Sequence, residues 1–200
     1  DVAGRIREML ESKETIRMIF AAAPSQNEFL EALVADAHID FSRIDAFHMD
    51  EYIGLPADAP QGFGNFLRDR LFSKAPFRSV QYLNGLAADP EEECRRYGTL
   101  LAGGVDIVCM GIGENGHIAF NDPAFAEFKD PKPVKIVELD PVCRMQQVHD
   151  GCFGTLEQVP THALTLTIPT INADTLVSTA VARNAAAILI ILPLMVLFVF

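Results

Sequence analysis

The sequence predicts an α/β fold in which a mostly parallel sheet lies between two layers of helices. Three observations predict it. The 200 residues suit a single domain with a sizeable core. Strand-like and helix-like patterns alternate along the chain, which is typical of parallel strands joined by helices. The expected strands at 15–22 and 105–110 are rich in apolar residues, as buried strands are.

Apolar residues at helical spacing mark the helices, and short apolar runs mark the strands. One helix has a clear start at Asp89, an N-cap residue followed by Pro90 and acidic residues. We therefore expect helices around residues 2–10, 29–34, 63–71 and 90–101, and strands at 15–22, 43–49, 80–83, 105–110, 134–139 and 175–181.

Two segments fit this alternation less simply. Residues 120–160 are richer in Pro, Asp and Gly, and we expect this part of the single domain 1–200 to form a flap over the site. Residues 185–200 contain no polar side chain. They are fewer than the roughly 20 residues that span a bilayer. Buried strands of the parallel sheet therefore explain them better than a membrane anchor does.

Charge and cysteine spacing exclude several classes of protein. The 16 Lys and Arg against 27 Asp and Glu give a net charge of −11, which argues against a nucleic-acid partner. The four cysteines include no C-x-x-C pair, so we expect neither a zinc site nor a redox motif. The chain opens with a charged amphipathic stretch instead of a signal peptide. We expect a cytoplasmic protein with reduced thiols and no membrane partner. A homo-oligomer is compatible with the sequence.

Three connections should lie at the carboxyl ends of strands, where ligands bind in such sheets. They are residues 22–26, 50–52 and 111–117. Asp50 and Glu51 directly follow an expected buried strand, so a carboxylate there could be partly desolvated and act as a base. Taken alone, an Asp that merely starts a turn is the commoner explanation.

The glycine-rich loop gives the strongest signal. Gly113 and Gly116 are two of its three glycines, which allow tight turns and close approach of the backbone to a ligand. Backbone N–H groups in such a loop can hold an anion. His117 follows, with Asn115 and Asp122 nearby. A His flanked by an amide and a carboxylate suits acid–base chemistry, because a partner can fix its tautomer. The glycines favour this over a His that only caps a turn.

Two further elements could bind an anion. Arg144 could grip a phosphate through two parallel hydrogen bonds, although a solvated surface Arg explains it about equally well. Ser25 lies in the loop Ala22-Ala-Pro-Ser-Gln26, before a helix whose N-terminus could hold a phosphate. Simple capping by Ser25 explains this loop at least as well.

Three stretches resemble glucosamine-6-phosphate deaminases. Residues 47–55 (FHMDEYIGL) are similar to the family's Asp-Glu-Tyr segment. Residues 111–123 (GIGENGHIAFNDP) resemble its signature G-x-G-x-[DN]-G-H-I-[AG]-F-N-E-P, which is long enough to be specific. Residues 159–168 resemble its V-P-x-x-A-L-T segment. The likeness runs from about residue 15 to about residue 181 and implies a Rossmann-like three-layer sandwich.

The resemblance also implies an activity. The family opens the ring of glucosamine 6-phosphate, moves a proton between C2 and C1, and releases ammonia to leave fructose 6-phosphate. Asp50 would shuttle the proton and His117 would assist ring opening, with Asn115 and Asp122 positioning His117. The only implied partner is a small-molecule sugar phosphate, and no metal or organic cofactor is implied. The residues that would bind the substrate are Ala23, Ser25, Gln26, Glu51, Gly113, Gly116 and Arg144.

The chain departs from the family pattern in three places. Many relatives have a Gly-Gly-Thr-Pro turn where this chain has Ala22-Ala-Pro-Ser25. Asn115 and Asp122 stand where some relatives have Asp and Glu. Relatives carry a Lys after the last strand, and the nearest cation here is Arg183.

Two other functions share the fold. The first is 6-phosphogluconolactone hydrolysis, but those lactonases usually have Ser-Leu-Phe-Pro where this chain has Phe120-Asn-Asp-Pro123. The second is a non-catalytic sugar-phosphate sensor. The presence of both Asp50 and His117 favours a catalyst over a sensor.

Overall fold

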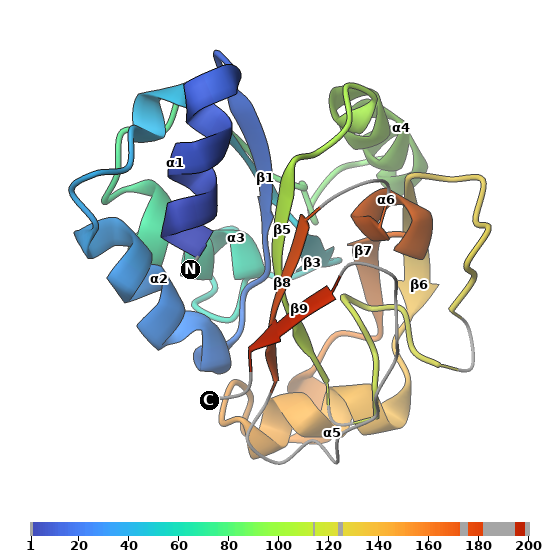
Figure 1. Cartoon of the computed structure of the whole chain (residues 1–200). Helices are drawn as coiled ribbons and strands as arrows, with labels where there is room; N and C mark the ends of the chain where they lie inside the picture. The colour runs from blue at the N-terminus through green and yellow to red at the C-terminus, as the bar shows by residue number, and fades with distance from the viewer. Residues whose placement is uncertain (1, 114, 124–125, 173–175, 182–194, 199–200) are drawn as a thin grey trace.

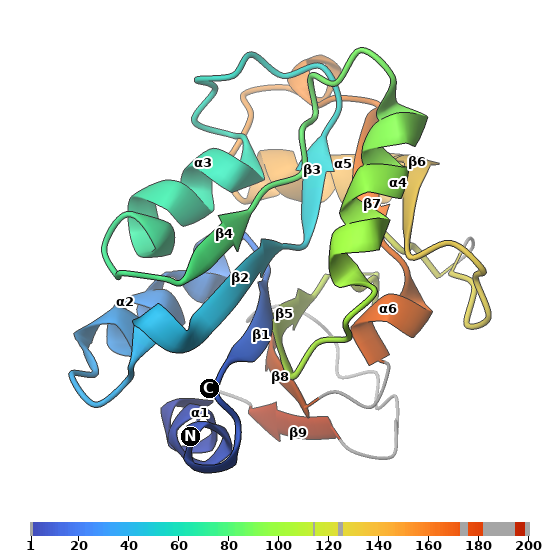
Figure 2. The same ribbon diagram turned by 90° about the horizontal axis from the view of Figure 1, so that it is seen from above.

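The computed structural model of the chain describes residues 2–113, 115–123, 126–172, 176–181 and 195–198. It confirms the α/β class: a six-stranded parallel sheet lies between two sets of helices (Figures 1 and 2). One face is covered by α1 (Val2–Ser12), α2 (Asn27–Ala35) and α3 (Phe63–Leu67), and the other by α4 (Pro90–Leu101) and α6 (Ile168–Asn172). No helix in these ranges has the length and apolar character that a membrane crossing requires.

The strand order creates a topological switch between β1 and β5. The parallel sheet contains β1 (Ile16–Phe20), β2 (Ile44–His48), β4 (Ser79–Gln81), β5 (Ile107–Ile112), β8 (Leu176–Val181) and β9 (Met195–Phe198). Their order across the sheet is β4-β2-β1-β5-β8-β9. The chain thus builds outward on one side of β1 and then on the other. Ligands bind beyond the carboxyl ends of the strands at such a switch.

The central strands are rigid because both of their faces are buried. Side chains alternate along a strand, so Met18 and Phe20 pack under α1 to α3 while Ile19 packs on the side of α4 and α6. Val108 and Met110 of β5 join the second cluster. All five side chains are inaccessible to solvent. The loops at the carboxyl ends of β1 and β5 therefore rest on a fixed platform.

A second, antiparallel sheet is a feature that the sequence patterns do not predict. It contains β3 (Asp50–Tyr52), β7 (His162–Leu166) and β6 (Val134–Glu138), in the order β3-β7-β6. The expected loop at 50–52 is therefore a strand, which pairs Asp50 with Thr165. The expected strand at 134–139 belongs to this sheet and not to the parallel one. Both differences arise from β7, an unexpected strand, although Leu164-Thr-Leu-Thr-Ile168 alternates apolar and polar residues as strands do.

The expected flap at 120–160 is packed against the core. This segment holds β6 and helix α5 (Pro141–His149). Phe120, Leu139, Cys143 and Phe153 are all buried in the cluster under α1 to α3. Movement of the segment over the site stays a prediction.

The C-terminal part of the chain agrees with the expected strands where the structure describes it. The strand expected at 175–181 is β8, which pairs with β5 in parallel. Of the apolar run 185–200, residues 195–198 form β9, parallel to β8. Residues 182–194 and 199–200, including Arg183, lie outside the described residues.

Helix α3 continues into a π-helical turn, Arg68–Phe72. The N–H of Ser73 donates to the carbonyl of Arg68, five residues earlier, at 3.0 Å. Leu71 and Phe72 are buried in this turn, while Arg70 reaches the first residue of α2, Asn27. Turns of this kind occur often at functional sites.

The hydroxyl group of Tyr97 forms hydrogen bonds with backbone groups at the ends of β2 and β4. This fully buried side chain comes from α4. Its oxygen accepts a hydrogen bond from the N–H of His48 at 2.8 Å, and its proton points toward the carbonyls of His48 (2.8 Å) and Gln81 (3.0 Å). β2 ends at His48 and β4 at Gln81. Tyr97 therefore satisfies backbone groups at the point where the chain leaves the parallel sheet for β3.

Replacing Tyr97 with Phe should lower the free energy of unfolding by about 1–3 kcal/mol, because it leaves buried backbone groups without a partner. Urea denaturation measures this. Tyr82→Phe is the control: that side chain is 37% exposed, so its hydroxyl can bond to water, and the change should stay within about 0.5 kcal/mol. Equal losses for both variants would contradict the role given to Tyr97.

Candidate active site

One cavity lies at the switch point of the sheet. Its volume is about 480 Å³, within the usual range of small-molecule sites. Its walls come from the loop after β1, the start of β3, α3 and its π turn, the loop after β5, and the end of α5. The lining residues are 21–25, 27, 49–50, 60–61, 63, 66, 70, 111–113, 117, 119–120, 146–147 and 150–152.

His117 is oriented by a relay of two side chains. The Oδ1 atom of Asn115 lies 2.6 Å from His117 Nδ1 and also accepts the His117 backbone N–H at 3.1 Å. Asn115 Nδ2 donates to Asp122 Oδ1 at 2.8 Å. A carboxylate only accepts, so Asp122 turns the amide nitrogen of Asn115 toward itself and the amide oxygen toward His117. Nδ1 therefore carries a proton, and Nε2 is the nitrogen that can exchange one.

Asp122 acts on His117 through Asn115 and not directly. Its Oδ1 lies 3.7 Å from His117 Nδ1, beyond hydrogen-bond distance. Asp122 is 3% exposed. A short acidic side chain at 122 and an amide at 115 thus suffice to fix the His117 tautomer.

The absence of a side chain at Gly113 makes room for the His117 ring. A Cβ atom at Gly113 would lie 2.0 Å from Cε1 and 2.4 Å from Nδ1 of that ring. The loop is closed by the Gly113 N–H, which donates to the His117 carbonyl, and by the Gly116 N–H, which donates to the Gly113 carbonyl, both at 2.9 Å. Gly116 has φ of 86°, which glycine adopts readily. Ala119, with φ of 51°, holds a conformation that costs a non-glycine residue energy.

Asp50 lies against the same cavity with a perturbed carboxyl group. It is 7% exposed. Burial raises its pKa to about 8, and the negative charge of Glu51 adds to the shift. It is the first residue of β3, just past the point where the chain leaves β2. A carboxylate with so high a pKa is a much stronger base than an ordinary one.

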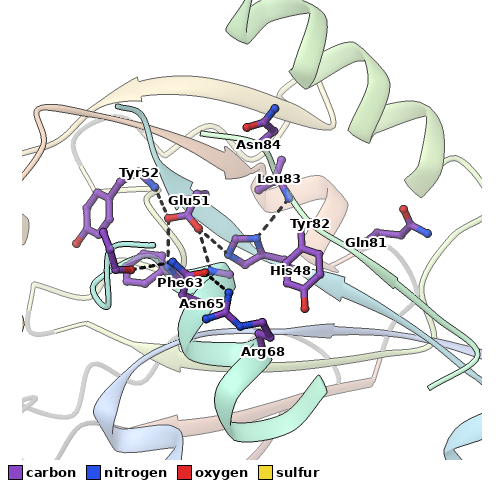
Figure 3. Close-up of polar contacts among 12 residues, drawn as sticks. His48, Glu51, Tyr52, Phe63, Asn65, Arg68, Gln81, Tyr82, Leu83 and Asn84 are labelled. Atoms are coloured by element: carbon purple, nitrogen blue, oxygen red, sulfur yellow. Dashed lines mark hydrogen bonds and ion pairs between the residues drawn. The ribbon is translucent and has the colours of Figure 1, made fainter. Parts of the chain in front are cut away.

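Glu51 does not line the cavity but binds the N-terminus of α3 (Figure 3). Its carboxylate accepts hydrogen bonds from the backbone N–H groups of Tyr52, Phe63 and Gly64 at 2.9, 3.1 and 2.9 Å. Its Oε2 lies 3.8 Å from Nε2 of His48. His48 is fully buried, which lowers its pKa to about 3, and burial raises the pKa of Glu51. Glu51 therefore ties β3 to the helix that forms one wall of the site.

The structure brings part of the predicted set together. The predicted residues that line the cavity are Asp50, His117, Ala23, Ser25 and Gly113, with Asn115 and Asp122 behind His117. Those that do not line it are Gln26, Glu51, Gly116 and Arg144. Gln26 is only 2% exposed, and Gly116 contributes its backbone to the loop.

Arg144 was expected to bind phosphate, but it does not line the cavity. Its Nη2 donates to the carbonyls of Leu156 and Val159, both at 2.7 Å. These carbonyls flank the short 3₁₀ turn Leu156–Gln158 between α5 and β7. Carbonyl groups removed from water need a donor. Arg144 supplies it and thereby fixes that loop.

Sequence reasoning missed several residues of the cavity. Nothing in the sequence around Arg70 indicates the cavity, because its reach toward Asn27 depends on tertiary structure. Gln146 and Gln147 come from the last turns of α5, and residues 150–152 from the loop after it. The polar run QQVHDG at 146–151 is the one local signal that could have indicated them.

One group of side chains in the described residues has the spacing of metal ligands. The ligand atoms of His117, Asp122 and Cys143 lie within 4.8 Å of one another. Cys143 Sγ is 4.0 Å from His117 Nε2. Burial raises the pKa of the Cys143 thiol, with nearby carboxylates adding to the shift. The thiolate is the form that binds metals, so the chemistry of this group does not favour a metal ion.

Comparison with known proteins identifies the family. Residues 1–187 match the family model described as glucosamine-6-phosphate isomerases/6-phosphogluconolactonase. A glucosamine-6-phosphate deaminase of an Exiguobacterium species is 37% identical over 183 residues, 90% of this chain and 70% of that protein. One of Bacillus thuringiensis is 38% identical over 169 residues, 83% of this chain and 62% of that protein. The chain thus spans less than two thirds of the length of the Bacillus relative.

Solved structures agree with the family match. The structure of a monomeric glucosamine-6-phosphate deaminase has a TM-score of 0.79 and 30% identity, covering 90% of this chain and 76% of that one. A 6-phosphogluconolactonase from Thermotoga maritima has a TM-score of 0.68 at 22% identity, over 90% of this chain and 77% of that one, and shows the shared fold alone. Fold and family match together define a Rossmann-like α/β enzyme with a cavity at the switch point. The chain belongs to the glucosamine-6-phosphate isomerase/6-phosphogluconolactonase family.

Replacing Gly113 with Ala should displace the His117 ring, because the new methyl group would overlap it. We expect ¹⁵N NMR of His117 to change from the Nδ1–H tautomer to a mixture of tautomers as the bond to Asn115 breaks. Gly4→Ala is the control, since the nearest atom to its Cβ lies at 4.0 Å. An unchanged tautomer in the Gly113 variant would refute this account of the loop.

Replacing Glu51 with Gln should lower the pKa of Asp50 by roughly one unit, because it removes a neighbouring negative charge that disfavours the Asp50 carboxylate. Titration of the Asp50 carboxyl carbon by ¹³C NMR measures this. Glu93→Gln is the matched control, since Glu93 is also buried but is paired with Arg96. An Asp50 titration that is identical in all three proteins would show that Glu51 exerts no such effect.

Proposed function

We propose that the chain catalyses the conversion of glucosamine 6-phosphate to fructose 6-phosphate and ammonia. The observation that carries the proposal is that Asp50 and His117, with Asn115 and Asp122 behind His117, line the same cavity at the switch point. The relatives that carry the deaminase name and match most of this chain support the choice of substrate. The overall change consumes one water and exchanges the amino group for a carbonyl.

Ring opening requires a proton at the ring oxygen and loss of the proton on the C1 hydroxyl. His117 suits this step because imidazole exchanges protons near neutral pH. With Nδ1 held on Asn115 at 2.6 Å, the exchanging nitrogen is Nε2. Asp122 supports the imidazolium through the amide. His117 lines the cavity, as this role requires.

Isomerisation requires one base that removes the proton from C2 and returns it to C1. Asp50 suits this step, because a carboxylate can take the proton from one carbon and deliver it to the next. The resulting imine at C2 then adds water and releases ammonia. With a pKa of about 8, Asp50 is a strong base among carboxylates, and kcat/KM should rise with pH until Asp50 is ionised.

Lactone hydrolysis is the alternative reaction within the family. The solved lactonases are similar in fold, but the stretch Phe120-Asn-Asp-Pro123 resembles the deaminase motif, with Asp122 in place of Glu. Asn121 is 3% exposed and donates to the carbonyls of Ile118 and Leu166, so this stretch holds the His117 loop against β7. The deaminase reaction therefore ranks first.

We further propose that the protein works in the cytoplasm. The four cysteines are present as free thiols, as is usual in reducing compartments. A deaminase of similar structure is monomeric, and we propose no fixed assembly for this chain.

Replacing Asp50 with Asn tests the proposal in a coupled assay for ammonia and fructose 6-phosphate. The wild type should turn over, and Asp50→Asn should lose about 10²- to 10⁴-fold in kcat, the usual contribution of a general base. The variant should nevertheless be the more stable protein at pH 9. The reason is that a carboxyl group with pKa about 8 folded and 3.8 unfolded destabilises the fold as pH rises between those values. This separates lost chemistry from lost structure.

Three results would contradict the proposal. Equal activity of wild type and variant would remove Asp50 from the mechanism. Faster hydrolysis of 6-phosphogluconolactone than of the amino sugar would favour the lactonase. Tight binding of sugar phosphate without turnover would favour a sensor.

A further inference from the structure

Arg70 is the one Lys or Arg among the described residues that line the cavity. The other charged or titratable lining groups are Asp50, Asp150, His117 and Cys152. Among the described lining residues, a dianionic ligand would therefore meet two carboxyl groups and a single permanent cation. The position of that cation must decide where an anionic group can lie.

The guanidinium of Arg70 is held in a defined plane. Its Nε donates to Oδ1 of Asn27 at 2.6 Å. Its Cζ lies 4.0 Å from the centroid of the Phe66 ring, a cation–π contact. Neither terminal nitrogen has a hydrogen-bond or ion-pair partner among the residues that the structure describes. Two parallel N–H donors are thus available from a side chain that is already oriented, which is the arrangement that binds phosphate in bidentate fashion.

Arg70 lies beside a second element that favours anions. Asn27 is the first residue of the nine-residue helix α2, which follows the loop after β1. The Asn27 N–H donates to the Pro24 carbonyl of the preceding 3₁₀ turn, so α2 favours an anion at this end through the positive end of its helix dipole. Ala23 and Ser25 of that loop line the cavity as well. An oriented guanidinium and a helix N-terminus therefore meet at one end of the cavity.

We propose that Arg70 binds the phosphate group of the substrate between itself and the N-terminus of α2. The proposal rests on the function proposed above and assigns its substrate specificity. Arg144, the cation expected to do this from the sequence, is committed to two carbonyls outside the cavity. Arg70 thereby takes the place of a phosphate ligand in a chain whose first loop, Ala22-Ala-Pro-Ser25, lacks glycine.

The test compares Arg70→Met and Arg70→Lys with Arg68→Met in the full chain. Arg68 lies in the same π turn but bonds Asn65 and Asp69 outside the cavity, so its loss removes the same charge from the same segment. For glucosamine 6-phosphate, Arg70→Met should raise KM about tenfold or more and change kcat less than about threefold. Arg70→Lys should have a KM between those of the wild type and Arg70→Met, because Lys keeps the positive charge but lacks the two parallel N–H donors of the guanidinium. Arg68→Met should match the wild type.

A second readout uses inorganic phosphate and does not depend on turnover. Phosphate should raise the Tm of the wild type and of Arg68→Met, and raise that of Arg70→Met much less. Equal KM values and equal phosphate stabilisation in both Met variants would overturn the assignment of Arg70, with the proposed reaction intact. A wild type that turns over no amino-sugar phosphate, yet loses phosphate stabilisation on Arg70→Met, would support the anion site and overturn the proposed reaction instead.

Discussion

The crossing of the chain from one sheet to the other, between His48 and Asp50, determines most of the site. β2 must end there with its backbone satisfied, which the buried hydroxyl of Tyr97 achieves. β3 must begin there as the partner of β7. A carboxyl group at such a junction is surrounded by packed structure, and this burial raises its pKa. Side chains alternate along a strand, so Glu51 points away from the cavity and can hold α3 in place.

The parts of the fold that depend on local pattern could be predicted. Apolar runs marked β1, β2 and β5, and the Asp89-Pro90 start marked α4. The glycine–histidine loop could also be predicted, because its residues contact others that are close to them in the sequence. Gly113 accommodates the ring of His117, and Asn115 binds it. Beyond these local contacts, the loop depends only on the end of β5, which directly precedes Gly113.

The parts that depend on distant partners could not be predicted in the same way. β3 has only three residues, too few to show a periodic pattern. It forms because it pairs with β7, which lies more than a hundred positions further along the chain. Glu51 was expected to line the site with Asp50 because the segment was expected to be a loop. In a strand, consecutive side chains point to opposite faces, and residues 50–52 form a strand. Arg144 and Arg70 are both exposed-looking cations in the sequence. Only packing shows that one holds carbonyls at a turn and the other reaches the cavity.

The π-helical turn at Arg68–Phe72 also constrains how the sequence can vary. Such a turn holds one residue more than an α-helical turn, and one residue corresponds to a rotation of about 100° around the helix axis. Deleting Arg68 or Asp69 would give a more regular helix and leave every residue that lines the cavity in the sequence. It would nevertheless turn Arg70 relative to Phe66 and Asn27. In this stretch, therefore, the number of residues matters to the site as well as their identity, because it sets the direction in which Arg70 points.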